Sequence, residues 1–246
     1  MDETMLLIAG TIGAGMLLIA GTIGAGKSSL TDMLSQEMNS KPFYENVDDN
    51  EVLPLFYSNP EKYTFLLQVF FLNKRFLAMK DALPQADNVL DRSIYEDSLL
   101  FHLNADLGRV SSEEVKQYDH LLDTMLKELE HTAPKKRPDL LVHIKVSFDV
   151  MLERIEKRGR DYEQIATNPE LYDYYKLVIE RYEKWLDSFT ICLKIQIGGD
   201  RYDFVADPKA AEIVINQIKE ETNKLNVSTF KNASYYSSEK MEKGIF

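Results

Sequence analysis

The chain has 246 residues, a net charge of -11, and ordinary shares of hydrophobic (44%) and charged (28%) residues. This length and composition fit one large globular domain. The acidic balance argues against a general nucleic-acid binder, because such proteins need basic surfaces. No apolar run is long enough to span a bilayer, and the single cysteine, Cys192, excludes an internal disulfide. We expect a cytoplasmic protein with no membrane partner.

An identical tandem copy stands near the start of the chain. Residues 5–15 are repeated without change as residues 16–26, and only the second copy continues into a lysine. Such identity indicates a recent duplication or an artefact, not a repeat architecture. We therefore expect residues 1–15 to be an extra segment, disordered or packed on a sheet edge, ahead of a domain at residues 16–222.

From residue 16 onward, short apolar runs alternate with segments of helical period. Strands are predicted at residues 16–20, 88–90, 140–146 and 193–197, and residues 43–45 are predicted to end a further strand, the second along the chain. Helices are predicted at residues 27–38, 65–82, 113–129, 148–158, 169–188 and 208–222. This alternation predicts an α/β fold with a parallel sheet of about five strands flanked by helices. The polar residues 223–246 show no sustained period, which predicts a flexible C-terminal tail.

The turn between the first strand and the first helix has the sequence Gly-Thr-Ile-Gly-Ala-Gly-Lys-Ser. Its glycines let backbone N–H groups converge on phosphate oxygens. Lys27 can place its charge on the β and γ phosphates, and Ser28 can ligate Mg²⁺ beside the positive end of the helix. The turn is a P-loop, so we expect the P-loop NTPase-type fold and binding of ATP with Mg²⁺. The predicted ATP-binding residues are Gly21, Thr22, Ile23, Gly24, Ala25, Gly26, Lys27, Ser28 and Ser29.

Charged residues follow the predicted strands. Glu45, after the second strand, could accept a proton from an attacking hydroxyl. Asp91 and Arg92, after the third strand, could hold Mg²⁺ and neutralise a transferring phosphoryl group. A dense basic cluster surrounds the helix-breaking Gly159 and predicts a mobile arginine lid. The cluster comprises Arg154, Lys157, Arg158 and Arg160. Each group alone also fits ordinary solvated charges.

Taken in order, these blocks resemble the deoxynucleoside kinase family over roughly residues 16–222, and in particular the bacterial deoxyadenosine/deoxyguanosine kinases. The blocks that carry the resemblance lie at residues 46–50, 53–57, 67–75, 91–97 and 158–163. The resemblance implies that Glu45 is the general base for the 5′-hydroxyl and that Arg92 holds that hydroxyl and the incoming phosphoryl group. It places Asp91 near Mg²⁺, and Arg158 and Arg160 in the lid.

The resemblance also assigns the two ends of the substrate. Tyr57 and Glu163 match the pair that holds the sugar 3′-hydroxyl, and Gln68, Arg75 and Asp97 match the groups that contact the base edge. Residues 68 and 75 are two helical turns apart and would share one face, while Asp97 could receive an amino group or pair with the arginine. On the donor side, the match implies contacts to ATP from Arg154, Arg158, Asp203 and Phe204.

These assignments predict ATP-dependent phosphorylation of a deoxynucleoside at its 5′-hydroxyl, in deoxynucleotide salvage. The resemblance favours a purine, with deoxyadenosine slightly ahead of deoxyguanosine, and a homodimer or a heterodimer with a similar chain. One alternative is a nucleoside monophosphate kinase, which usually grips its substrate phosphate with an arginine near the second strand. Residues 41–50 contain no arginine and three acidic residues, which favours a neutral nucleoside. Another alternative is a non-catalytic partner subunit that binds nucleotide without turnover.

A switch GTPase is disfavoured by the sequence. Such a protein would need the guanine motif Asn-Lys-x-Asp, and residues 73–76 read Asn-Lys-Arg-Phe in the middle of a predicted helix. The aspartate that would read the guanine base is missing. The P-loop therefore favours phosphoryl transfer to an acceptor over a nucleotide-driven switch.

Overall fold

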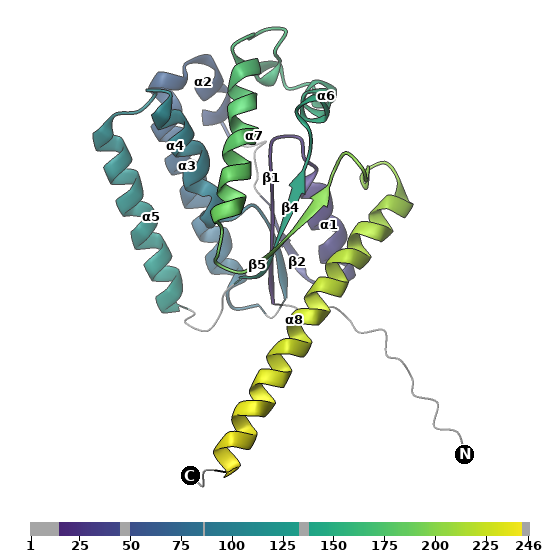
Figure 1. Cartoon of the computed structure of the whole chain (residues 1–246). Helices are drawn as coiled ribbons and strands as arrows, with labels where there is room; N and C mark the ends of the chain where they lie inside the picture. The colour runs from purple at the N-terminus through teal and green to yellow at the C-terminus, as the bar shows by residue number, and fades with distance from the viewer. Residues whose placement is uncertain (1–14, 45–49, 86, 133–137, 243–246) are drawn as a thin grey trace.

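The computed structural model describes residues 15–44, 50–85, 87–132 and 138–242. Its centre is one sheet of five parallel strands in the order β2-β3-β1-β4-β5 (Figure 1). The predicted α/β fold is confirmed. The strands are β1 (Met16–Gly21), β2 (Lys41–Phe43), β3 (Asn88–Asp91), β4 (Pro138–Lys145) and β5 (Leu193–Gly198).

Helices follow the strands and cover the sheet. They are α1 (Lys27–Glu37), α2 (Val52–Ser58), α3 (Pro60–Ala82), α4 (Asp97–Asp106), α5 (Ser112–Thr132), α6 (Phe148–Arg158), α7 (Leu171–Ser188) and α8 (Pro208–Glu242). Two short 3-10 turns are η1 (Ile94–Glu96) and η2 (Asp161–Glu163).

The central strand β1 fixes where a ligand can bind. It pairs with β3 on one side and with β4 on the other, and all of its residues are buried. Leu17 and Ile19 face a cluster that includes α1, α6 and α8, whereas Leu18 and Ala20 face a cluster that includes α5. Burial on both faces explains the unbroken apolar run in the sequence. The loop after β1 therefore opens at the carboxyl ends of its neighbours, where ligands bind in parallel sheets.

Helices α2 and α4 were not predicted from the sequence, and α3 begins earlier than predicted. In α4, the buried Leu99, Phe101 and Leu103 alternate with the period of a strand, which hides the helix. Helix α2 is also short, with seven residues. Helix α3 begins at Pro60, and the side chain of Asn59 accepts a hydrogen bond of 3.1 Å from a backbone N–H in its first turn. This cap followed by proline is a helix-start signal that the sequence contained.

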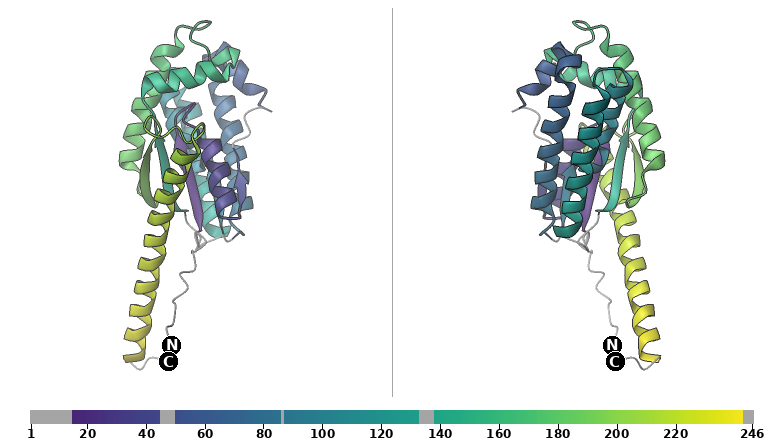
Figure 2. Two further views of the ribbon diagram at one scale, coloured as in Figure 1. Left: turned by 90° about the vertical axis from the view of Figure 1, so that its right-hand side faces the viewer. Right: turned by 90° about the vertical axis from the view of Figure 1, so that its left-hand side faces the viewer.

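The C-terminal part of the chain corrects one prediction. Residues 223–242, expected to be a flexible polar tail, continue α8 as helix to Glu242. This part of α8 runs past the end of the sheet (Figures 1 and 2). The prediction was based on the lack of a hydrophobic period in these residues. Such a period is required only of a helix that packs one face on a core, so its absence does not exclude a helix. The duplicated copy at residues 5–15 lies almost wholly outside the described residues and stays a prediction.

Membrane-spanning segments were not expected. Within the described ranges, no helix combines the length and the apolar content needed to cross a bilayer.

A matched pair of leucine substitutions tests the sheet. Leu141 of β4 is fully buried, whereas Leu193 of β5 is 59% exposed. Leu141→Ala should lower the free energy of unfolding by about 2–5 kcal/mol, because it leaves a cavity between packed side chains. Leu193→Ala should change it by less than about 0.5 kcal/mol. Urea denaturation followed by circular dichroism measures both, and similar losses for the two variants would contradict the described position of β4.

Candidate active site

The loop between β1 and α1 has a backbone suited to phosphate. Gly24 and Gly26 have φ of 74° and 94°, in the left-handed region that favours glycine. A Cβ added at Gly26 would lie 3.1 Å from the ring of Phe204, so a side chain there would be crowded. Helix α1 begins at this end of the loop, and the positive end of its dipole attracts anions there. The predicted P-loop therefore has the local geometry that its sequence required.

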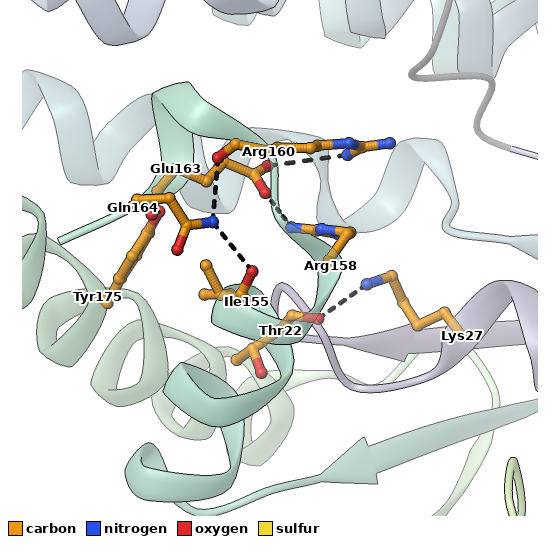
Figure 3. Close-up of polar contacts among 8 residues, drawn as sticks. All are labelled: Thr22, Lys27, Ile155, Arg158, Arg160, Glu163, Gln164 and Tyr175. Atoms are coloured by element: carbon orange, nitrogen blue, oxygen red, sulfur yellow. Dashed lines mark hydrogen bonds and ion pairs between the residues drawn. The ribbon is translucent and has the colours of Figure 1, made fainter. Parts of the chain in front are cut away.

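Lys27 and Ser28 begin α1 where the central strands end. The Lys27 Nζ donates to the backbone oxygen of Thr22 at 2.8 Å, which holds the ammonium group over the loop (Figure 3). The Ser28 Oγ donates to Oδ2 of Asp91, the last residue of β3, at 2.5 Å. A hydroxyl and a carboxylate thus lie side by side at the loop, and oxygen ligands of this kind suit Mg²⁺.

Among the described residues, no group of three or more His, Cys, Asp or Glu side chains could hold a metal ion. Mg²⁺ in phosphoryl-transfer sites commonly takes only one or two protein oxygens and completes its shell with phosphates and water. The pair of Ser28 and Asp91 fits that pattern.

Two cavities adjoin the P-loop. The acceptor cavity, of about 530 Å³, extends toward α2, α3 and η2, and the donor cavity, of about 630 Å³, extends toward α6 and the loop after β5. Gly24, Lys27, Ser28 and Arg158 line both cavities. Two ligands, one in each cavity, would meet at these residues. Holding two reactants face to face in this way is what a group-transfer reaction needs.

The predicted lid lies between the two cavities. Helix α6 ends at Arg158, and Gly159 leaves the helix with a left-handed φ of 70°. Arg158 forms an ion pair with Glu163, and the Arg160 Nη1 lies 3.8 Å from Oε1 of the same carboxylate (Figure 3). The Gln164 amide donates to the backbone oxygens of Ile155 and Arg160, at 3.1 Å each. Both predicted lid arginines therefore share one carboxylate and line the acceptor cavity.

Tyr57 and Glu163, predicted to hold a sugar hydroxyl, both line the acceptor cavity. Glu163 is 3% exposed, and its backbone oxygen accepts a hydrogen bond of 2.9 Å from the Tyr175 hydroxyl. Burial raises the pKa of Tyr57 well above its ordinary value, and the charge of Glu163 acts in the same direction. Tyr57 is therefore a neutral phenol that can donate a hydrogen bond.

The predicted base-reading residues lie at the far end of this cavity. Gln68 and Arg75 lie on one face of α3 and both line the cavity. Asp97, at the start of α4, is buried and forms an ion pair with Arg75. The structure thus realises the second of the two roles foreseen for Asp97. It holds the arginine, and it is not among the residues that line the cavity.

Arg92 lies near the P-loop in an unusual backbone conformation. Its φ of 66° is left-handed, which costs a residue other than glycine about 1–3 kcal/mol. Its N–H donates to the backbone oxygen of Ile19 at 2.9 Å, and its side chain lines the acceptor cavity with Lys27. The predicted general base, Glu45, lies outside the described residues, so its assignment stays a prediction.

The donor cavity revises two predicted contacts. Arg154 lines the cavity, but its guanidinium also donates to the backbone oxygens of Ala25 (3.2 Å) and Gly199 (2.9 Å). It therefore joins the P-loop to the loop after β5. Phe204 is 2% exposed, packs on Gly26 and does not line the cavity, whereas Asp203 and Val205 do. Chain position alone could not distinguish the inward side of this loop from the outward side.

Sequence reasoning missed the apolar wall of the acceptor cavity. This wall consists of Leu53, Phe56, Leu67, Phe71, Leu100 and Tyr174. Such side chains suit a flat, partly apolar ligand, because ligand pockets combine an apolar lining with a few polar groups. In the sequence these residues resemble ordinary core positions, and only the fold separates those that face the cavity from the rest.

Comparisons with known proteins agree with this geometry. A family model described as "Deoxynucleoside kinase" matches residues 17–223. A deoxyguanosine kinase of Lactobacillus acidophilus is 54% identical over 215 residues, which cover 87% of this chain and 89% of the relative. A deoxyadenosine kinase of the same species is 44% identical over 221 residues, covering 90% and 97%. A solved structure of deoxyadenosine kinase from M. mycoides with bound dATP aligns with a TM-score of 0.68 at 24% identity, covering 82% and 98%, and supports the fold.

Two glycines test the geometry of the loop. Gly26 and Gly108 both have left-handed φ, but a Cβ at Gly108 would meet nothing within 4 Å. Both alanine variants should therefore lose roughly 1 kcal/mol of stability. Only Gly26→Ala should also lower the affinity for a nucleoside triphosphate, by about tenfold or more, because the crowded Cβ displaces the P-loop. Titration calorimetry measures the affinities, and equal affinity in the two variants would refute the requirement for glycine.

Proposed function

Because the chain belongs to the deoxynucleoside kinase family, we propose that it transfers the γ-phosphoryl group of ATP to the 5′-hydroxyl of a purine deoxynucleoside. The observation that carries this proposal is the meeting of the two cavities at Lys27, Ser28 and Arg158. ATP would occupy the donor cavity with its phosphates on the P-loop. The nucleoside would occupy the acceptor cavity with its 5′-hydroxyl toward Arg92.

The proposed chemistry uses positioning and charge. Glu45 takes the proton of the 5′-hydroxyl, the oxygen bonds to the γ-phosphorus, and ADP leaves. Lys27, Arg92 and the lid arginines neutralise the charge on the moving phosphoryl group. Ser28 and Asp91 would hold Mg²⁺, which supplies further positive charge at the phosphates when bound. At the far end of the substrate, Tyr57 and Glu163 would hold the 3′-hydroxyl.

The choice between purines follows from the base end of the cavity and from the relatives. Arg75 offers only donors, and guanine presents two acceptors, O6 and N7, on the edge where adenine presents one acceptor and an amino group. Of the two bacterial relatives, the one at 54% identity is named deoxyguanosine kinase and the one at 44% deoxyadenosine kinase. We therefore favour deoxyguanosine. The deoxyadenosine preference expected from the sequence is not confirmed by these comparisons.

Three further points concern the rival reaction, the cellular location and the oligomeric state. A nucleoside monophosphate kinase would need cations around a substrate phosphate. Among the described residues, the arginines that line the acceptor cavity are Arg75, Arg92, Arg158 and Arg160. The proposed function assigns the first to the base and the other three to the transferred phosphoryl group. The cytoplasmic location and a dimer with a similar chain rest on family likeness.

An activity assay tests the function and the specificity together. The chain is incubated with ATP, Mg²⁺ and each of the four common deoxynucleosides or their monophosphates. We expect kcat/KM for deoxyguanosine to exceed that for deoxyadenosine, and both purines to exceed the pyrimidines by about tenfold or more, because one mismatched polar contact is worth about 1–3 kcal/mol. Transfer only to monophosphates would favour the rival kinase class. Nucleotide binding with no transfer would favour a partner subunit.

The general base is tested by Glu45→Gln. This change should lower kcat by about 100-fold or more, because proton transfer by a positioned side chain contributes about 10²–10⁴-fold. The dissociation constant of the nucleoside should change little, since the amide keeps the size of the side chain. Glu113→Gln, at an exposed position in the first turn of α5, is the matched control and should behave as the native chain. Near-normal turnover in Glu45→Gln would remove Glu45 from the mechanism.

A further inference from the structure

A buried polar contact lies behind Arg92, outside both cavities. Glu96, four residues further along the chain, brings its Oε1 to 3.7 Å from the Arg92 Nε. The Glu96 residue is 2% exposed and lines neither cavity, whereas Arg92 lines the acceptor cavity. A carboxylate this deeply buried requires compensation by opposite charge and hydrogen bonds. Glu96 therefore touches the arginine from its protein side and is beyond the reach of a ligand in the cavity.

The same carboxylate oxygen is fixed from a distant part of the chain. The hydroxyl of Tyr182 on α7 donates to the Glu96 Oε1 at 3.0 Å, and Tyr182 is 1% exposed. The next turn of α7 adds a separate contact, in which the Trp185 indole N–H donates to the backbone oxygen of Tyr95 at 3.3 Å. Helix α7 thus holds η1 by one bond to the side chain of Glu96 and by another to the backbone.

His143, whose ring stacks on that of Tyr182, adds no positive charge beside the ion pair of Glu96 and Arg92. The rings of His143 and Tyr182 lie 6.2 Å apart at an angle of 25°. Burial lowers the pKa of His143 to about 4, and nearby lysines act in the same direction. The imidazole is therefore neutral at ordinary pH. The positive charge beside Glu96 comes from Arg92.

We propose that Glu96 is a positioning residue for phosphoryl transfer, which with Tyr182 aims the guanidinium of Arg92 at the junction of the two cavities. The proposal rests on the role given to Arg92 in the proposed function. Arg92 needs such support because its backbone stands in a sparsely populated conformation, and a long side chain otherwise samples many rotamers. A guanidinium held in place before the reaction stabilises developing charge without reorganisation.

The test separates aiming from simple stabilisation by a set of conservative variants. Glu96→Gln keeps the shape and an acceptor for Tyr182 but removes the charge that orients Arg92. Tyr182→Phe keeps the ring and removes only the hydroxyl. Trp185→Phe is the matched control, since it removes the other bond between α7 and η1 and leaves the carboxylate untouched. Steady-state kinetics give kcat and the KM for the nucleoside, and thermal unfolding reports the stability of each variant.

Misplacing one preorganised donor should lower kcat by about tenfold or more in Glu96→Gln and by a smaller factor in Tyr182→Phe, with KM for the nucleoside within about threefold. The double variant should lose no more than Glu96→Gln alone, because both changes act on the same arginine. Trp185→Phe should keep kcat within about twofold even where its Tm falls. If Glu96→Gln does not fold, Tyr182→Phe against Trp185→Phe decides the question.

Arg92→Ala in the same assay separates the proposed role of Arg92 in phosphoryl transfer from the positioning role of Glu96. A large loss of kcat in Arg92→Ala, together with normal kcat in Glu96→Gln and Tyr182→Phe, overturns the positioning role alone. Normal kcat in Arg92→Ala overturns the proposed role of Arg92 and the positioning role with it. Equal losses of kcat in Tyr182→Phe and Trp185→Phe would assign the effect to the docking of α7 and would also overturn the proposal.

Discussion

The hydrogen bond between Ser28 and Asp91 joins the two strands on which the site depends. Ser28 begins the helix that follows β1, and Asp91 ends β3, the parallel neighbour of β1. Parallel pairing brings both carboxyl ends to one edge of the sheet. This pairing alone places the phosphate loop, the oxygens of Ser28 and Asp91, and Arg92 next to one another. Buried apolar residues on both faces of β1 hold this register.

The parts of the fold that obey a simple period could be predicted from the sequence. Four of the strands, the P-loop and α6, whose predicted residues 148–158 match its observed bounds, each have a local pattern that burial or capping enforces. Strand β2 is the exception, because it ends at Phe43 instead of residue 45, and only that last residue is buried. Helix α4 could not be found in this way, because its buried residues alternate as in a strand. The end of α8 also escaped, since no hydrophobic period marks residues 223–242.

The sequence predicted which polar residues gather at the candidate site more completely than it predicted where their side chains face. Gln68, Arg75, Tyr57 and Glu163 all line the acceptor cavity, as the motif order suggested. Asp97 and Phe204 have supporting roles instead, behind Arg75 and against Gly26. The order of motifs gives the neighbourhood of a residue. Whether a side chain faces the ligand or its protein neighbour depends on the rotation of the backbone at that position, which only the tertiary structure fixes.

The shared carboxylate of Glu163 has an energetic consequence for the two ligands. Glu163 offsets part of the positive charge on Arg158 and Arg160. A sugar hydroxyl bound to Glu163 would compete with these ion pairs, and a triphosphate beside Arg158 would draw on the same charge. The affinities of the two substrates would then be thermodynamically linked, and by reciprocity each would change the binding of the other by the same factor. One side chain would thus couple recognition of the sugar to the electrostatic field at the phosphates.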